Sequence, residues 1–388
     1  MGSHGTPLLR SGVAVMRKSH AVTSLVLVVA LSSVASAGRL AKVWEANLTK
    51  AIGIEAGAEG FPVFAMRFSP AGDRLAVIVD GRASGGGERS RLIVLEVAHP
   101  LSGVREFEVA PGVNENESVR IPLSFGWSPS GAIVYAAGTI VSISSGSTCT
   151  APSPVVFVTE ELAIARIPAV PPSDGSSRIV FYNSECRQLG TWDVKENWLI
   201  EDVSTQRALL SVWRTINRTE AESILVDPLT RTVVRRWPQK NGWSGPGQFA
   251  DNGRAICRGG NVWEGRTVPA VCWNVDTGQE IARTSHSNGT EPLAAAAGAT
   301  RMTLSDYREQ RRIFSEDGWT SGFKGRIAWD FGTGQELASW RPEAQTYTYD
   351  SPSGTKKITE PARFAMSPDG RCVAEGANGI VRLYRIEP

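Results

Sequence analysis

The 388-residue sequence predicts an all-β fold built from repeated four-stranded units. Two segments, 271–282 (VCWNVDTGQEIA) and 326–340 (RIAWDFGTGQELASW), repeat one another almost residue for residue. Each has a short apolar stretch, a Gly-containing turn with one position at positive φ, and a second stretch, as expected of two strands joined by a hairpin. Repeats of this kind are typical of sheet units that stack on their neighbours, so further copies are expected along the chain.

The first complete unit covers 64–109 and supplies the pattern for the others. Its innermost strand ends in the turn 69–72 (SPAG), in which Pro fixes φ and Gly allows a positive φ. Four strands are predicted, at 64–68, 75–79, 91–97 and 104–109. The last of them alternates apolar and polar residues, as an edge strand should.

Five more units follow, at 125–194, 198–237, 248–283, 293–340 and 364–386. The second has its third and fourth strands at 178–182 and 189–194, and an insertion whose segment 155–167 forms an extra hairpin or a unit of its own. The last unit is one strand short, and an isolated strand at 40–46 has no unit. We expect this strand to complete the last unit, because closing the ring removes an exposed sheet edge. Six units are preferred and seven are possible.

Several motifs resemble WD40 and WD40-like β-propeller repeats, including those of exported bacterial propellers. They are the Trp-Asp pairs at 192–193 and 329–330 and the turns 276–280 (DTGQE) and 367–370 (SPDG). The resemblance covers about residues 40–388 and implies a scaffold that binds partners on its faces, usually without catalysis. WD40 repeats usually carry a Gly-His pair, whereas the two histidines after residue 37, His99 and His286, stand in no such pair. Closure between the blades is therefore expected to depend on apolar packing.

Residues 1–37 form a predicted signal peptide. Arg17 and Lys18 precede an apolar run over 21–30, and small residues at 35–37 suit signal peptidase. Met16 could be the true start. An uncleaved membrane anchor is the alternative, although the run is short for a bilayer span.

Cleavage near Ala37-Gly38 would leave a propeller domain over 38–388 that is secreted or periplasmic and has no stable membrane span. It would remove Arg10, Arg17 and Lys18 and no acid, so the formal charge would change from +2 to −1 (2 − 3). A nearly neutral domain lacks the basic face that binding to nucleic acid requires.

Five cysteines in an exported chain favour disulfides. Cys257 and Cys272 lie on two strands of one predicted hairpin, whose tip is near Trp263, so they are expected to face each other and pair. Cys149 and Cys186 are a weaker candidate pair, which leaves Cys372 as a buried thiol. The alternative is that all five are reduced core residues.

The sequence offers few residues for catalysis. Two histidines cannot build a His-rich metal site, and phosphate-binding loops, nucleophile elbows and Cys-x-x-Cys motifs are absent from the sequence. The segment 242–245 (GWSG) lies in a Pro/Gly-rich loop without the strand-to-helix context of a nucleophile elbow. We therefore predict no catalytic residue, no metal ligand and no cofactor.

A candidate binding surface follows from the strand order. Loops between the second and third strands of a blade emerge on the same face as the links between blades. Aromatic and arginine residues, which often anchor protein interfaces, gather in these segments of the later units: Trp243, Trp263, Trp319, Phe323, Tyr347, Tyr349, Arg308, Arg311 and Arg312. The alternative is that these aromatics fold inward and hold the insertions in place.

The sequence thus predicts one all-β propeller of four-stranded antiparallel blades, closed by its N-terminal strand. The preferred function is an exported, non-catalytic scaffold that binds a protein or glycan partner. The alternative is a propeller enzyme, such as a metal-dependent hydrolase or lactonase, with its site in the central channel.

Overall fold

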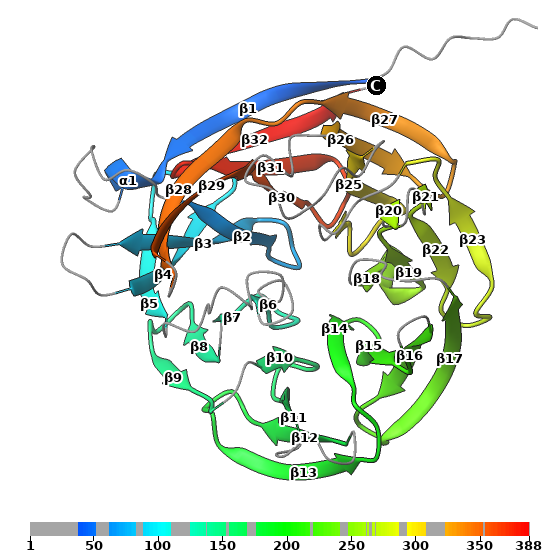
Figure 1. Ribbon diagram of the computed structural model, residues 1–388. Helices are drawn as coiled ribbons and strands as arrows, with labels where there is room; N and C mark the ends of the chain where they lie inside the picture. The colour runs from blue at the N-terminus through cyan, green and yellow to red at the C-terminus, as the bar shows by residue number, and fades with distance from the viewer. Residues whose placement is uncertain are drawn as a thin grey trace, which may run out of the picture. The chain divides into compact units, whose positions relative to one another are not determined.

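The computed structural model describes residues 38–51, 62–82, 88–109, 125–136, 138–152, 155–168, 176–217, 220–240, 247–260, 262–263, 266–267, 269–286, 293–307, 323–351 and 354–387. All of them belong to one unit, Ala37–Pro388. The predicted signal peptide lies outside the described residues. Within the unit, seven four-stranded antiparallel sheets succeed one another around a ring, which makes the domain a seven-bladed β-propeller (Figure 1).

The first four blades are continuous in sequence. Blade 1 contains β2 (Val63–Phe68), β3 (Arg74–Arg82), β4 (Glu88–Glu96) and β5 (Arg105–Val109). Blade 2 contains β6 (Phe125–Trp127), β7 (Ile133–Ala136), β8 (Thr139–Ser142) and β9 (Thr148–Thr150). Blade 3 contains β10 (Val155–Phe157), β11 (Ala163–Pro168), β12 (Ser177–Tyr182) and β13 (Gln188–Val194). Blade 4 contains β14 (Leu199–Ser204), β15 (Leu209–Thr215), β16 (Glu220–Asp227) and β17 (Thr232–Lys240).

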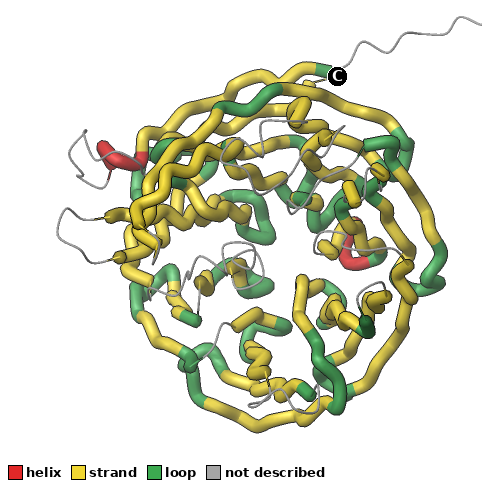
Figure 2. The backbone as a smooth tube through the Cα atoms, in the orientation of Figure 1, coloured by secondary structure: helices red, strands yellow, loops and turns green. Residues whose placement is uncertain are grey.

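The later blades carry small additions. Blade 5 contains β18 (Gly247–Ala250), β19 (Ala255–Arg258), β22 (Val271–Asn274) and β23 (Glu280–Arg283), with the hairpin β20 (Val262–Trp263) and β21 (Arg266–Thr267) inserted. Blade 6 contains β24 (Ala294–Ala295), β25 (Arg301–Tyr307), β26 (Phe323–Asp330) and β27 (Gln335–Trp340). Blade 7 contains β30 (Arg363–Met366), β31 (Cys372–Ala377), β32 (Ile380–Glu387) and β1 (Arg39–Asn47). A second hairpin, β28 (Ala344–Ser351) and β29 (Gly354–Pro361), links blades 6 and 7. Among the described residues, the helical elements are α1 (Leu48–Ala51) and a 3₁₀ turn at Asp251–Gly253 (Figure 2).

The preference for six blades was wrong, because the predicted second unit is two blades. Blade 2 is completed by β8 and β9, which have only four and three residues and are rich in Ser and Thr. Strands this short give little periodicity, so the sequence pattern favoured β12 and β13 for the third and fourth positions instead. The insertion at 155–167 supplies β10 and β11, the first two strands of blade 3.

The predicted closure is confirmed. β1 pairs antiparallel with β32 through eight residue pairs, among them Trp44 with Leu383 and Lys42 with Tyr384. The turn chemistry is confirmed as well, since Gly72, Gly131 and Gly370 of the inner-strand turns all have φ near +70° (75°, 74° and 68°). A side chain at these positions would strain the turn.

Both apolar packing and hydrogen bonds join the blades, so the expectation of apolar packing was incomplete. The buried clusters lie between sheets; Val134 and Ile78, for example, belong to one cluster shared by blades 2 and 1. Polar contacts also cross every junction: Trp127 Nε1 to Arg67 O (3.0 Å), Ser128 Oγ to Glu160 (3.0 Å), Trp198 N to Ser177 Oγ (3.0 Å), Trp237 Nε1 to Gly278 O (3.0 Å), Asn252 N to Ala297 O (2.6 Å), Gly298 N to Pro368 O (2.9 Å) and Trp44 Nε1 to Val97 O (2.8 Å). At three of these junctions the donor is an indole N–H group, from Trp127, Trp237 and Trp44.

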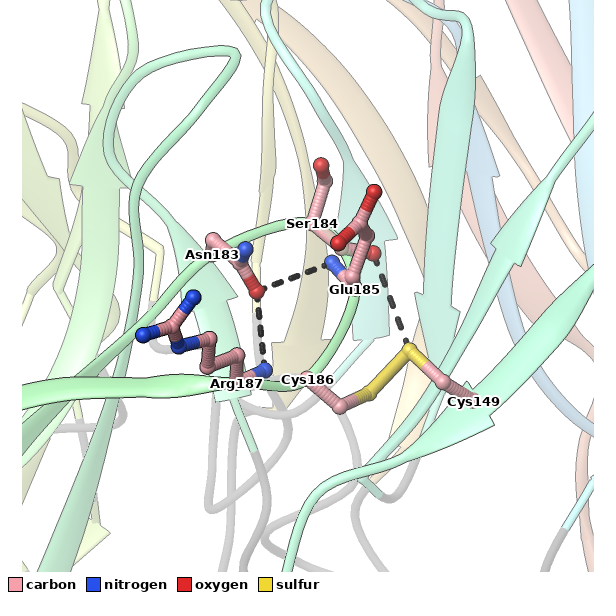
Figure 3. The surroundings of a disulfide bond; sticks show 6 residues. All are labelled: Cys149, Asn183, Ser184, Glu185, Cys186 and Arg187. Atoms are coloured by element: carbon pink, nitrogen blue, oxygen red, sulfur yellow. Dashed lines mark hydrogen bonds between the residues drawn. A yellow bond between two sulfur atoms is a disulfide. The ribbon is translucent and has the colours of Figure 1, made fainter.

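Both predicted disulfides are present. Cys257 and Cys272 are directly opposite on β19 and β22, with Cα atoms 4.0 Å apart. Cys149 on β9 bonds to Cys186 in the turn between β12 and β13, so this bridge joins blade 2 to blade 3 (Figure 3). The carboxamide of Asn183 accepts hydrogen bonds from two backbone N–H groups of that turn. Cys372 is a free, half-buried thiol.

Candidate functional site: the central channel and the connection face

The two faces of the propeller follow from its strand order. The turn after each inner strand and the turn between third and fourth strands emerge on one face, here called the turn face. The loop between second and third strands and the link to the next blade emerge on the other, here called the connection face. Hairpins β20–β21 and β28–β29 are both parts of such connections and therefore lie on the connection face.

A cavity of about 410 Å³ occupies the central channel. It is lined by the inner strands of every blade except blade 3, and it follows β2 from Phe64 at the connection end to Pro70 at the turn end. The aromatic residues of the wall are Phe64, Phe68, Phe125, Trp127, Tyr135, Phe249 and Phe364. Pockets of this size with mostly apolar walls and a few polar groups are the usual binding sites for small groups.

An ion pair crosses the channel. Arg67 of blade 1 lies 3.5 Å from Asp202 of blade 4, and the other carboxylate oxygen of Asp202 accepts a hydrogen bond from Phe249 N (2.8 Å). Burial raises the pKa of Asp202, and the charge of Arg67 and the backbone N–H groups of Phe249 and Val203 oppose that rise. The carboxylate of Asp202 is therefore already stabilised by contacts with protein groups.

Tyr135 lies beside this pair in the channel wall. Burial raises the pKa of its phenol to about 12, with the positive charge of Arg67 opposing the rise and the negative charge of Asp202 adding to it. The phenol is consequently neutral near pH 7 and is a poor general base there.

A second ion pair lies on the lining near the connection end. Arg363 on β30 contacts both carboxylate oxygens of Glu360 on β29, at 2.9 and 2.8 Å. Arg326, which is 2% exposed, stacks over the ring of Phe364 at 4.0 Å and donates to Ala362 O at 3.0 Å. Both carboxylates of the described lining, Asp202 and Glu360, are thus engaged with an arginine.

The donor set does not suit a bound metal. Among the described residues, no group of three or more His, Cys, Asp and Glu side chains is close enough to hold a metal ion. Both carboxylates of the described lining already accept hydrogen bonds from an arginine.

Hairpin β28–β29 connects the connection face to the junction between blades 7 and 1, here called the seam of the ring. Gln345 is fully buried, and its carboxamide accepts from Val63 N (3.0 Å) and donates to Val63 O (3.0 Å) and Glu360 (2.8 Å). Tyr347 packs edge-to-face on Phe64 at 5.9 Å. The hairpin leaves blade 6, precedes blade 7 and contacts blade 1, so it spans the junction that β1 closes on the outside. The sequence pattern alone predicts no strands in this segment.

The structure describes only part of the predicted binding surface. Phe323 is buried, with the guanidinium of Arg326 5.6 Å from its ring, and Tyr347 on β28 is half-buried. Trp263 and Tyr349 lie on β20 and β28. The remaining members lie outside the described residues: Trp243, Trp319, Arg308, Arg311 and Arg312. Their gathering on one face remains a prediction.

The channel residues were not predicted as a site. A signal existed, because Arg67 interrupts an otherwise apolar inner strand and Asp202 follows Glu201 on another inner strand. Their partnership joins residues 135 positions apart, which a single sequence cannot show.

Comparison with known proteins shows the fold and nothing narrower. No protein-family model matches the sequence, and no curated protein matches it. Among solved structures, 880 chains are similar. One of them, in the structure described as "Crystal Structure of Mitotic Checkpoint Complex", has a TM-score of 0.52 and 12% identity, with 99% of each chain covered. At this identity the likeness establishes a β-propeller, a fold that serves many functions.

Proposed function

We propose that this protein is an exported, non-catalytic scaffold that binds a protein partner at its connection face. The observation that carries the proposal is that the carboxylates lining the channel are already paired. Asp202 and Glu360 are each paired with an arginine, so neither is free to act as general base, nucleophile or metal ligand without loss of an ion pair. The solved neighbour named above is part of a protein complex, which agrees with a binding role.

Export is supported by the predicted leader and by the two disulfides, because disulfides persist in oxidising compartments. No helix in the part of the chain that the structure describes has the length and apolar character needed to cross a bilayer. Mass spectrometry of the protein expressed with its own leader tests this part. We expect a mature N-terminus at Gly38 in the exported fraction, and an intact leader would contradict it.

Metal analysis and activity tests separate the scaffold from an enzyme. Purified protein should contain less than one equivalent of Ca²⁺ or Zn²⁺ and should not hydrolyse lactones or esters. A stoichiometric metal, together with hydrolysis that stops when the metal is chelated, would replace the proposal with the metal-dependent enzyme.

A further inference from the structure

We infer that the central channel receives an uncharged aromatic group, and that in a bound partner this group is an aromatic side chain inserted from the connection face. The inference deepens the proposed function and rests on it for the identity of the partner, but not for the chemistry of the cavity.

The size of the cavity limits what can enter. About 410 Å³ holds one bicyclic or monocyclic ring system with room for a short connecting chain, and is too small for a folded element. Aromatic residues from blades 1, 2, 5 and 7 line the wall, such as Phe64, Trp127, Phe249 and Phe364. Aromatic pairs add about 0.5–1.5 kcal/mol to the burial of their area, so an aromatic guest fits this wall better than an aliphatic one.

The charged groups of the wall already have partners. Arg67 is paired with Asp202 and Arg363 with Glu360, and Arg326 stacks over Phe364 and donates to Ala362 O. An anionic or cationic guest would lose hydration and would have to displace one of these contacts to gain a counter-charge. A neutral ring loses little hydration and leaves both pairs intact.

The connection end is one side from which a partner can reach the cavity, whose lining extends from Phe64 at this end to Pro70 at the turn end. Thr359, Glu360 and Pro361 of hairpin β28–β29 line the cavity directly, and the same hairpin is part of the connection face. A partner that docks on the hairpin is therefore next to the channel mouth. The proposed partner surface and the aromatic cavity are therefore next to each other.

Three probes of equal heavy-atom count test the chemistry: indole, benzoate and benzamidine. Ligand-observed NMR on the purified domain should show indole binding at least about tenfold tighter than either ion, the penalty expected for one unpaired charge. Equal or tighter binding of benzoate or benzamidine would overturn the inference.

Substitutions of residues in the channel wall test whether indole binds in the channel. Ala294 lines the channel from β24, so Ala294→Trp should fill the space and reduce indole affinity at least about tenfold, whereas Ala294→Ser should leave it unchanged. Val203→Trp, from blade 4, repeats the test if Ala294→Trp does not fold. Indole binding that survives in a folded channel-filling variant would show that indole binds elsewhere, and the inference would fail.

A random peptide display on the immobilised domain distinguishes a side chain from a free compound. Selected peptides should share one Trp, Tyr or Phe, should lose binding when it is changed to Ala, and should be displaced by indole. If indole enters the channel but no peptide or protein binds, the cavity chemistry stands and the proposed protein-binding function fails. Selected peptides that share Lys, Arg, Asp or Glu instead of an aromatic residue would overturn the inference while the scaffold function stands.

Discussion

Gln345 supplies with its side chain the hydrogen bonds that a neighbouring strand would give to Val63. Its carboxamide satisfies both the N–H and the C=O of a residue that is fully buried. A buried amide group without a partner costs about 1–3 kcal/mol, which makes this one side chain important for the seam.

Gln345→Ala should lower the free energy of unfolding by about 2–4 kcal/mol, because it leaves two backbone groups of Val63 unsatisfied. The exposed Gln279→Ala is the matched control and should change it by less than about 0.5 kcal/mol. Urea unfolding followed by tryptophan fluorescence gives both values. If both substitutions changed the free energy of unfolding by the same small amount, the hairpin would not stabilise the seam.

Glu375 predicts a pH dependence with a definite sign. It is 4% exposed and accepts from Trp340 Nε1 at 3.0 Å; burial raises its pKa above 4.5, and the Trp340 hydrogen bond opposes the rise. The native state thus holds this proton more tightly than the unfolded state, so the contribution to stability is present below pH 4.5 and is lost as pH rises through the native pKa.

Glu375→Gln keeps an acceptor for Trp340 and cannot ionise. Relative to the wild type, its Tm should therefore rise progressively above pH 4.5 and be highest at neutral pH. Thermal unfolding from pH 4.5 to 8 measures the difference, with the exposed Glu185→Gln as control. A difference that shrinks as pH rises would show that the sign is wrong.

At the scale of elements, β1 is the strand on which ring closure depends. It covers β32 along eight residue pairs, and Trp44 also donates to Val97 O of blade 1. Without β1, the edge of β32 would be open to pairing with other chains.

A chain that lacks residues 38–47 should aggregate or unfold at a lower temperature, and a synthetic peptide of 38–47 added in trans should restore a monomer. Size-exclusion chromatography with and without the peptide shows this, and a scrambled peptide is the control. A truncated protein that stays monomeric with an unchanged Tm would contradict closure by β1.

The bridge between Cys149 and Cys186 links two blades over a separation of 37 residues. Replacing both by Ser should lower stability by about 4 kcal/mol, the loop-entropy value for a loop of this length. Cys372→Ser, which changes a thiol that forms no disulfide, is the control and should cost much less. Denaturant unfolding under oxidising conditions compares the two, and equal losses would mean that the bridge does not constrain the unfolded chain.

The sequence predicted the repeated elements well and the site poorly, for physical reasons. The Trp-Asp pairs and the Gly turns recur in register, so the strands around them, such as β26 and β27, were found. The short β8 and β9 were missed because three or four residues carry too little periodicity. Arg67 is in blade 1 and Asp202 is in blade 4, three blades further along the ring. Their pairing therefore depends on how the blades close into a ring, which no local sequence pattern encodes.

At the scale of the whole domain, the ring assigns different roles to its faces. The turn face is occupied by hydrogen-bonded turns that contact the next blade, such as Gly298 with Pro368. The connection face carries the added hairpins and one mouth of the aromatic channel. Recognition is therefore expected on the connection face.

Site-specific photocross-linking tests this claim most directly. A benzophenone side chain replaces either Lys357, exposed on β29 at the connection face, or Leu229, 54% exposed in a turn of blade 4 at the turn face. In the native exported fraction, we expect one discrete cross-linked partner from position 357 and none from position 229. A partner cross-linked only from position 229, or equally from both positions, would contradict the account.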